Sequence, residues 1–375
     1  MNKLPNGWTE YKLKDLCVIN YGKGLGKSNI VNGNIPVYSS GGIIGFHNTY
    51  NVNSEGVIIG RKGNAGSVFY SDKPFFCIDT AFYIEPNNQY DLKYLFYKLV
   101  SMNLKNHKTG TAIPGLIRND IYKLSISIPP LEEQKRIASA LSKIDAYLEN
   151  TIKLIEEKER FKRGIAKKLL TCKEGENIPE ARFKGFEDEW EIVKLGDMFD
   201  NFKEKNNEDK IILASTIDKG VIPNSLTERK IIRKKESLSN YKLVKKGCFV
   251  ISLMSFQSGF EYSDYEGIIS PAYTVLKPKI EMAHYFYKYY FKSFKFIKDL
   301  RPYAEGIRHG KQIKFKACKD ILVPYPSIEE QEKIGGYLSL LDAEIDNLKK
   351  QKELIKEMKR GAMQKLLSGE VRLLE

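Results

Sequence analysis

The sequence predicts an α+β protein built as a tandem repeat, in which two globular α/β regions are separated by two long antiparallel helices with pseudo-twofold symmetry. Three observations support this fold class. A long stretch occurs twice, each copy has the apolar spacing of one continuous helix, and the region before each copy combines short β-like runs with turn signals. A chain of 375 residues has room for two or three domains.

The repeat superimposes residues 129–171 on residues 326–368 without a gap, at an offset of 197 residues. An ungapped match of this length indicates an internal duplication. A weaker repeat precedes each copy, because GWTEYKLKDL (7–16) matches EWEIVKLGDM (189–198) at both tryptophans. The shared positions of the long repeat include Glu132/Glu329, Glu133/Glu330, Gln134/Gln331, Ile137/Ile334, Leu141/Leu338, Asp145/Asp342, Arg163/Arg360 and Gly164/Gly361.

Both copies are predicted to form long helices. Proline lies just before or at the start of each copy, where its missing N–H costs nothing, and carboxylates fill the first turn, where the helix dipole favours them. In the second copy Ser327 and Glu330 form a capping box. About forty residues at 1.5 Å each make a rod of about 60 Å, whose apolar stripe needs a partner, and the other copy is the obvious one.

The order of the segments predicts how the helices run. The first helix leads the chain from one globular region to the other and the second leads it back, so the helices should pack antiparallel with the globular regions at opposite ends. The sequence leaves the strand order in the globular regions open. The predicted domains are residues 1–130, the first helix at 131–171, a polar linker at 172–186, residues 187–327, and the second helix with a C-terminal tail at 328–375.

Each predicted helix contains a glycine after a Lys-Arg pair, at Gly164 and Gly361. A glycine inside a helix costs about 1 kcal/mol relative to alanine. A tolerated defect is one interpretation. We favour the other, in which the glycine allows a close helix crossing or a contact with a partner.

The charge distribution separates the roles of the segments. The net charge of +14 favours a polyanionic partner, although lysine-rich proteins without a nucleic-acid role are also common. Residues 1–130 and 172–327 each have six more basic than acidic side chains, whereas the segments 131–171 and 328–375 come to +3 and −1. The globular regions are therefore expected to face the polyanion, and the helices to face protein.

The five cysteines are scattered and form no CxxC motif, so neither a disulfide framework nor a zinc cluster is predicted. The first residues lack the apolar core of a signal peptide, and no apolar run is long enough to span a membrane. A reducing cytoplasm is the expected location.

The stretch YGKGLGKS (21–28) looks like a phosphate-binding loop that ends in Gly-Lys-Ser. The motif requires a glycine five positions before Gly26, and that position is Tyr21. The stretch also leads into Asn, Gly and Pro rather than into a helix. We therefore expect a surface loop in which Lys23 and Lys27 face phosphate or solvent.

Several motifs resemble those of one known family. PPLEEQKRIA and PSIEEQEKIG after the globular regions, PEARFKGFEDEW in the second half, and IPVYSSGGIIGFHNTY followed by GVIIGRKGNAGSVFY in the first are similar to the specificity (S) subunits of Type I restriction-modification systems. The resemblance covers essentially the whole chain. It implies two target-recognition domains that each read one half of a bipartite double-stranded DNA sequence, with helices that bind two modification (M) subunits.

The resemblance also implies restriction (R) subunits in the complex, with S-adenosylmethionine (SAM), ATP and Mg²⁺ in the partner subunits and no cofactor in this chain. The repeated helix positions are the candidate partner-binding residues. These are Glu132, Glu133, Gln134, Arg163, Gly164, Glu329, Glu330, Gln331, Arg360 and Gly361.

The candidate DNA-binding residues lie in basic loops. In GRKG, Arg61 and Lys62 stand between glycines, so backbone and cations can both approach phosphate, and arginine can also fork onto guanine O6 and N7. In the second region Gln257 is a natural adenine reader. The full candidate set is Lys23, Lys27, Arg61, Lys62, Asn64, Lys108, Thr109, Arg118, Gln257, Arg308, His309, Lys311 and Gln312.

No catalytic or metal-binding residues are predicted. The only Pro-Pro pair is preceded by Ile128 and does not form the loop that an adenine methyltransferase uses, and no glycine-rich SAM fingerprint follows a strand. The alternatives are a targeting subunit whose partner fuses nuclease and methylase, an assembly adaptor that does not read DNA, and an enzyme with unrecognised motifs.

Overall fold

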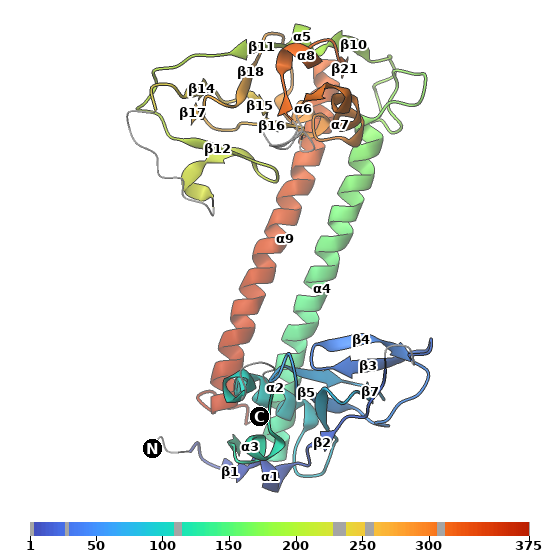
Figure 1. Cartoon of the computed structure of the whole chain (residues 1–375), viewed down its shortest axis with the longest axis vertical. Helices are drawn as coiled ribbons and strands as arrows, with labels where there is room; N and C mark the ends of the chain where they lie inside the picture. Colours follow the sequence, from blue (N-terminus) through green and yellow to red (C-terminus); the bar gives the residue numbers. More distant parts are fainter. Residues whose placement is uncertain are drawn as a thin grey trace. The chain divides into compact units, whose positions relative to one another are not determined.

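The computed structural model describes residues 4–26, 30–108, 115–227, 238–251, 259–305 and 312–374. Two helices dominate it, α4 (Leu131–Leu170) and α9 (Ile328–Ser368) (Figure 1). The chain forms two compact units, Met1–Lys153 with Lys350–Glu375, and Leu154–Lys349. Each unit therefore contains one globular region and a segment of both long helices. None of the helices in the described part is long and apolar enough to cross a membrane.

The globular region of the first unit consists of short strands and helices and is followed by α4. Its elements are β1 (Thr9–Lys12), α1 (Leu13–Leu16), β2 (Asn20–Tyr21), β3 (Ile35–Ser39), β4 (Gly42–His47), β5 (Gly56–Gly60), β6 (Val68–Ser71), β7 (Phe76–Cys77), β8 (Ala81–Ile84), α2 (Leu92–Ser101), the 3₁₀ helix η2 (Leu104–His107), α3 (Arg118–Tyr122) and β9 (Ser125–Ile128).

The second unit repeats this plan with additional strands. Its elements are β10 (Glu191–Lys194), α5 (Leu195–Met198), β11 (Phe199–Phe202), β12 (Leu213–Thr216), β13 (Gly220–Pro223), η3 (Asn224–Leu226), β14 (Lys242–Val244), β15 (Phe249–Ile251), β16 (Phe260–Tyr262), β17 (Gly267–Ile269), β18 (Thr274–Pro278), α6 (His284–Tyr290), α7 (Phe294–Leu300), η6 (Arg301–Tyr303), β19 (Ala304–Glu305), β20 (Gln312–Ile313), α8 (Phe315–Cys318) and β21 (Leu322–Tyr325).

Each globular region is built on a four-stranded sheet, in the order β2-β8-β5-β6 in the first unit and β11-β18-β15-β16 in the second. All pairs within these sheets are antiparallel. In β5, Val57 and Ile59 belong to the main core, whereas Ile58 packs on the opposite face with Tyr38 and Phe75. Because both faces of the strand are covered, the run GVIIG is apolar throughout.

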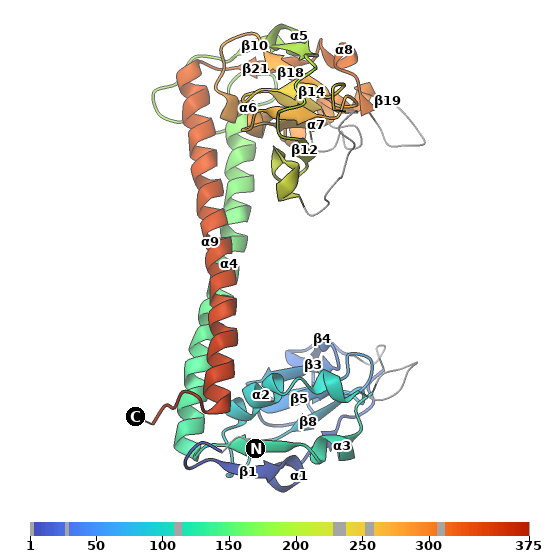
Figure 2. The ribbon, with the colours of Figure 1, turned by 90° about the vertical axis from the view of Figure 1, so that its left-hand side faces the viewer.

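The long helices pack antiparallel inside each unit. In the first unit Ile137 and Leu141 of α4 share a core with Leu366 and Leu367 of α9. In the second unit the core joins Leu169 and Leu170 of α4 to Ile334 and Leu338 of α9. The early part of α4 thus meets the late part of α9, and the reverse, which confirms the predicted antiparallel packing (Figure 2).

The duplication is visible in matching contacts within the two units. The Tyr97 hydroxyl donates to Asp145 at 2.7 Å in the first unit, and the Tyr289 hydroxyl donates to Asp342 at 2.7 Å in the second. Asp145 also pairs with Lys359, as Asp342 does with Lys162. Because the sequence offset relates Asp145 to Asp342 and Lys162 to Lys359, the two units are built by one repeated set of interactions.

Candidate nucleic-acid interface

The backbone of the basic loop after strand β5 is fixed by hydrogen bonds to Thr80. The N–H groups of Arg61 and Lys62 donate to the carbonyl oxygen of Thr80, at 2.8 and 3.1 Å. A side chain at Gly60 would come within 2.4 Å of the Asn64 carbonyl oxygen, so this turn requires glycine. The loop therefore presents the cations of Arg61 and Lys62 from a fixed backbone.

The ring of Tyr21 is close to two guanidinium groups. The Cζ atoms of Arg61 and Arg118 are 4.9 and 4.7 Å from the centroid of its ring. Each arginine also donates to a backbone carbonyl, Arg61 to Asp79 at 3.1 Å and Arg118 to Ile19 at 3.3 Å. We term Tyr21, Arg61 and Arg118 the arginine–tyrosine cluster. The two arginines were predicted as site residues, whereas Tyr21 was missed.

The glycine-rich stretch that resembles a phosphate-binding loop continues directly from Tyr21. A side chain at Gly22 would come within 2.0 Å of the Ile78 carbonyl oxygen, and the backbone of Lys23 forms a parallel bridge with Ile78. Gly22 therefore has a packing role. The side chain of Lys23 is exposed. Lys27 lies outside the described residues.

Two further predicted residues of the first unit are exposed. Asn64 is exposed, and its side-chain amide nitrogen would lie 3.0 Å from a Cβ atom at Gly41, in the β3–β4 turn. Lys108 is exposed just after η2. The structure thus places the β3–β4 turn next to the basic loop. Thr109 lies outside the described residues.

The predicted residues of the second globular region fall almost entirely outside the described part of the chain. This applies to Gln257, Arg308, His309 and Lys311. The backbone of Gln312 opens strand β20, but its side chain is also outside the described part.

A cluster of lysines on the second sheet was not predicted. Lys245 and Lys277 are far apart in the sequence but meet at one ring, with their ammonium groups 5.6 and 5.5 Å from the centroid of Phe202. Burial, together with the charges of Lys203 and Lys205, lowers the pKa of Lys242. We term this set the lysine cluster, and it consists of Lys203, Lys205, Lys242, Lys245 and Lys277.

The runs FKEK and YKLVKK contain four of these lysines, so part of the signal is present in the sequence. Only the pairing of β11 with β18 brings Lys277 alongside them, because Asp200 stands opposite Lys277 in that register. Because its ammonium groups repel one another, the lysine cluster is well suited to bind an anion.

Four of the predicted partner-binding residues are instead buried inside their own unit, which corrects the prediction for them. Glu133 and Glu330 are each 1% exposed and accept hydrogen bonds from arginines of the same chain.

The two glutamines bind the backbone of their own unit. Gln134 accepts the N–H of Asp91 and donates to the carbonyl oxygen of Pro129. Gln331 accepts the N–H of Ala283 and donates to the carbonyl oxygen of Pro326. They recur because both units need the same internal contacts, and no surface remains for a partner.

The capping box predicted at the start of α9 is formed only in part. The Ser327 hydroxyl accepts the Glu330 N–H at 3.3 Å, as predicted. The Glu330 carboxylate does not complete the box, because it accepts bonds from Arg182 and from the indole of Trp190.

The remaining predicted partner-binding residues lie on the outside of the helices. Glu132, Glu329, Arg163 and Arg360 are not buried. A Cβ atom at Gly164 or at Gly361 would have no described atom within 4 Å, so the close helix crossing proposed for these glycines is wrong.

An exposed apolar side chain precedes each of these glycines by three residues. Phe161 is 52% exposed and Met358 is 50% exposed. A contact with a partner stays a prediction.

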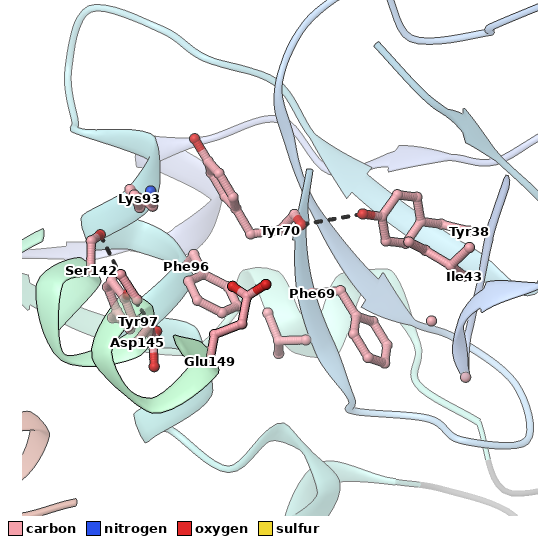
Figure 3. A pocket seen from close by; sticks show the side chains of 14 residues that line it. Tyr38, Ile43, Phe69, Tyr70, Lys93, Phe96, Tyr97, Ser142, Asp145 and Glu149 are labelled. Atoms are coloured by element: carbon pink, nitrogen blue, oxygen red, sulfur yellow. Dashed lines mark hydrogen bonds between the residues drawn. The ribbon is translucent and has the colours of Figure 1, made fainter. Parts of the chain in front are cut away.

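A cavity of about 630 Å³ lies in the first unit between the β3–β4 hairpin, strand β6, helix α2 and helix α4 (Figure 3). Five aromatic residues contribute to its lining, which are Tyr38, Phe69, Tyr70, Phe96 and Tyr97. The Tyr38 hydroxyl donates to the Tyr70 carbonyl oxygen at 3.3 Å. The Asp145 carboxylate at the cavity wall is occupied by Tyr97 and Lys359, so it offers no free charge to a ligand.

The comparison with known proteins decides the family. The family described as "Type I restriction modification DNA specificity domain" matches residues 5–157 and 187–357. The chain belongs to this family. The two matched segments contain the two globular regions and much of both long helices, in agreement with the tandem repeat. The chain is a specificity protein that recognises the DNA target within a Type I restriction-modification complex.

Similar proteins cover most of the chain. The specificity subunit of the Type I restriction enzyme MjaVIII of Methanocaldococcus jannaschii is 28% identical over 86% of this chain and 80% of its own length. A putative type I specificity subunit of Mycoplasma genitalium is 27% identical over 93% of this chain and 91% of its own length.

Two solved structures have the same fold. The S subunit of the Type I restriction-modification system from M. genitalium matches with a TM-score of 0.65 and 20% identity, over 97% of each chain. A chain from a structure of complex assembly in the type I system matches with a TM-score of 0.55 and 16% identity, over 99% of this chain and all of that one.

Proposed function

We propose that this specificity protein is itself non-catalytic and directs partner enzymes to a bipartite DNA sequence, with each globular region reading one half-site. The observation that supports this most directly is the duplication of a complete unit whose basic surface differs from one copy to the other. The first unit presents an arginine–tyrosine cluster, and the second presents a lysine cluster. Unlike surfaces on equivalent sheets are expected to bind unlike sequences.

The two clusters suit different DNA contacts. Arg61 and Arg118 have planar forks that fit guanine O6 and N7 or two phosphate oxygens. Lys62 and Lys23 are exposed point charges beside them and are assigned to phosphate. In the second unit the lysine cluster is assigned to the phosphate backbone, because the compact ammonium group neutralises charge without the geometry for base reading.

The partners follow from the repeated helix surfaces. We assign two M subunits to each chain, because Arg163 with Gly164 and Arg360 with Gly361 form equivalent sites on the outside of the helices. Methylation and cleavage belong to the M and R subunits, which hold SAM, ATP and Mg²⁺. We assign the complex to the cytoplasm, where chromosomal DNA of a prokaryotic cell is found.

Methylation mapping tests the function. The purified chain incubated with DNA and SAM should leave the DNA unmodified, whereas the chain with its M subunits should methylate one bipartite sequence. Native mass spectrometry of the complex should find two M subunits for one chain. Methylation by M alone with the same sequence preference would favour an adaptor that does not read DNA, and modification by the isolated chain would favour an enzyme.

Methylation mapping also shows which half-site the first unit reads. Arg61→Ala should change or relax one half-site and leave the other intact, at a cost of about 1–3 kcal/mol if the arginine forks onto a guanine. If a single partner protein supplies both nuclease and methylase activity, the chain instead serves the fused type of restriction system.

A further inference from the structure

Tyr21 lies at the edge of the first four-stranded sheet, between a buried aromatic ring and solvent. It lies in the edge strand β2, opposite Phe82 of β8. The rings of Tyr21 and Phe82 meet edge to face, with centroids 5.1 Å apart. Phe82 is fully buried, whereas Tyr21 is 46% exposed. One part of the Tyr21 ring is therefore fixed by the core, and the rest faces outward.

The Tyr21 ring also contacts two cations. The guanidinium carbons of Arg61 and Arg118 lie 4.9 and 4.7 Å from its centroid, within the distance of about 6 Å for a cation–π contact. Two guanidinium groups at one ring repel each other, so their convergence requires a compensating attraction. The ring supplies it, because its face carries negative charge density.

Hydrogen bonds connect the segments that contain the two arginines. The N–H of Leu116 donates to the Arg61 carbonyl oxygen at 2.8 Å, which joins the basic loop to the segment that leads into α3. The N–H of Ile19 donates to the Tyr122 hydroxyl at 2.8 Å, which joins the β2 side to the end of α3. The three side chains of the cluster therefore start from one connected framework.

The guanidinium of Arg118 has unused capacity in this arrangement. Its Nη1 donates to the Ile19 carbonyl oxygen at 3.3 Å. Its Nε is buried and has no hydrogen-bond partner among the described residues. Each guanidinium has five N–H donors, and within the described residues each of these two arginines uses its guanidinium for one hydrogen bond. Apart from the buried Nε of Arg118, the other guanidinium donors have no hydrogen-bond partner among the described residues, and in our proposal they bind a phosphate or a base edge.

We propose that Tyr21 is a positioning residue for DNA recognition by the first unit: its ring holds Arg61 and Arg118 in the orientation in which they bind the first half-site. This inference rests on the proposed function, because it requires that the first unit binds DNA. A long arginine side chain loses rotamer freedom when it forms a fork to a base or phosphate. The ring removes part of that freedom before the DNA arrives, which improves both affinity and selectivity.

A purely structural role for Tyr21 would be to cover Phe82, and substitutions separate the two roles. Tyr21→Leu keeps an apolar cover over Phe82 but removes the aromatic face. Tyr21→Phe keeps the face and removes the hydroxyl. Tyr11, an exposed tyrosine of strand β1, offers Tyr11→Leu as a matched control for the loss of a surface ring.

The test uses the complex of the chain with its M subunits and measures its dissociation constant for three duplexes: the cognate duplex, one altered in the first half-site and one altered in the second. Tyr21→Leu should weaken cognate binding about tenfold, as expected for two exposed cation–π contacts. It should lower discrimination at the half-site that the first unit reads and preserve discrimination at the other. Tyr21→Phe should restore binding to within about threefold of wild type, since the ring face remains.

A mutant cycle that combines Tyr21→Leu with the two arginine substitutions makes the test independent of general damage to the fold. In a chain that already has Arg61→Ala and Arg118→Ala, Tyr21→Leu should have almost no further effect, because no cation remains to be positioned. An equal loss in both backgrounds, or wild-type discrimination by Tyr21→Leu, would overturn the proposal. Failure of Tyr21→Phe to restore binding would also overturn it and assign the effect to the hydroxyl. Failure of the wild-type complex to discriminate either half-site would instead refute the proposed function.

Discussion

Arg372 and Glu133 form a bidentate ion pair in the first unit, with Nε and Nη2 each 2.7 Å from a carboxylate oxygen. The repeated carboxylate of the second unit, Glu330, receives Arg182 in the same way at 2.8 Å. In one unit the arginine comes from the tail after α9, and in the other from the segment after α4. The segment that follows each long helix thus neutralises the buried carboxylate at the start of the other long helix.

Removing either arginine should strongly destabilise its own unit. Arg372→Ala leaves Glu133, which is 1% exposed, as a buried and unpaired charge. Breaking a buried pair from one side costs about 3–5 kcal/mol. Arg182→Ala should act similarly on the second unit, partly relieved by the bond of 2.9 Å from the Trp190 indole to Glu330. Urea unfolding monitored separately for the two units measures both effects.

The control for this prediction is an exposed pair of the same helix. Lys135 contacts Glu132 at 2.7 Å on the surface, so Lys135→Ala should change stability far less. Adding Glu133→Gln to Arg372→Ala should recover part of the stability, because it removes the unpaired charge. If Arg372→Ala were no worse than Lys135→Ala, the buried pair would contribute nothing of note.

The helix glycines should separate stability from partner binding. Gly164→Ala and Gly361→Ala should each stabilise the free chain by about 1 kcal/mol, because alanine favours the helix and the added Cβ meets no described atom within 4 Å. Thermal unfolding of the free chain measures this. If M subunits approach these glycines, the same variants should weaken the complex with M.

Two neighbouring glycines of α9 serve as references. A Cβ at Gly336 also has no described atom within 4 Å, so Gly336→Ala should stabilise the chain and leave the M complex unchanged. A Cβ at Gly335 would lie 2.6 Å from the Phe286 backbone nitrogen, so Gly335→Ala should destabilise it. Equal effects of Gly164→Ala and Gly336→Ala on M binding would remove Gly164 from the interface.

Lys98 should make the stability of the first unit depend on pH. Its ammonium group donates to the Leu367 carbonyl oxygen at 2.6 Å, and burial lowers the pKa of Lys98 to about 8. Unfolded lysine has a pKa of about 10.4, so between these values the folded chain binds fewer protons than the unfolded chain. The stability that Lys98 contributes should therefore rise through this window and be lost as the pH falls through 8.

Lys98→Met isolates this contribution, because it removes the titrating group and keeps a side chain of similar length. The free energy of urea unfolding of wild type relative to Lys98→Met should increase between about pH 7.5 and about pH 9.5, the range that spans the lower part of the window. A difference between the two proteins that is constant with pH would mean that Lys98 keeps an ordinary pKa in the folded chain.

The lysine cluster should contribute to DNA binding through charge alone. Lys277→Ala or Lys245→Ala in the complex with M should lower the slope of log affinity against log salt by about one for each phosphate that the variant no longer neutralises. Both half-site preferences should survive, because phosphate contacts carry no direct sequence information. Lys184→Ala, an exposed lysine in the segment between the globular regions, is the control. An unchanged slope would exclude the cluster from the DNA surface.

The long helices and the tandem repeat were accessible to sequence analysis because their signals are local. Apolar spacing, a first turn rich in carboxylates and an ungapped repeat all lie within continuous segments, and α4 and α9 formed accordingly. The basic loop around Arg61 was also recognisable, because glycines on both sides of two cations are a local pattern. The function followed from motif resemblance and not from any of these features.

The role of the repeated helix residues, internal contact or partner binding, could not be decided from the sequence. Glu133 and Gln134 recur in the second copy, and recurrence predicted a partner surface. Recurrence shows only that two places in the chain have the same requirement. The requirement here is internal: Gln134 binds the backbone at Asp91 and Pro129, and Glu133 binds Arg372. Burial decides between the two interpretations, and burial depends on the folded chain.

The sequence by itself determined the helices, the duplication and the basic character of the globular regions, because each depends on neighbouring residues or on composition. The tertiary structure alone decided which side chains of the candidate site lie together. Tyr21, Arg61 and Arg118 meet only because β2 pairs with β8 and the loop after β5 binds the segment before α3. Pairing between distant strands leaves no periodic trace, since its free energy comes from contacts that exist only after the chain has folded.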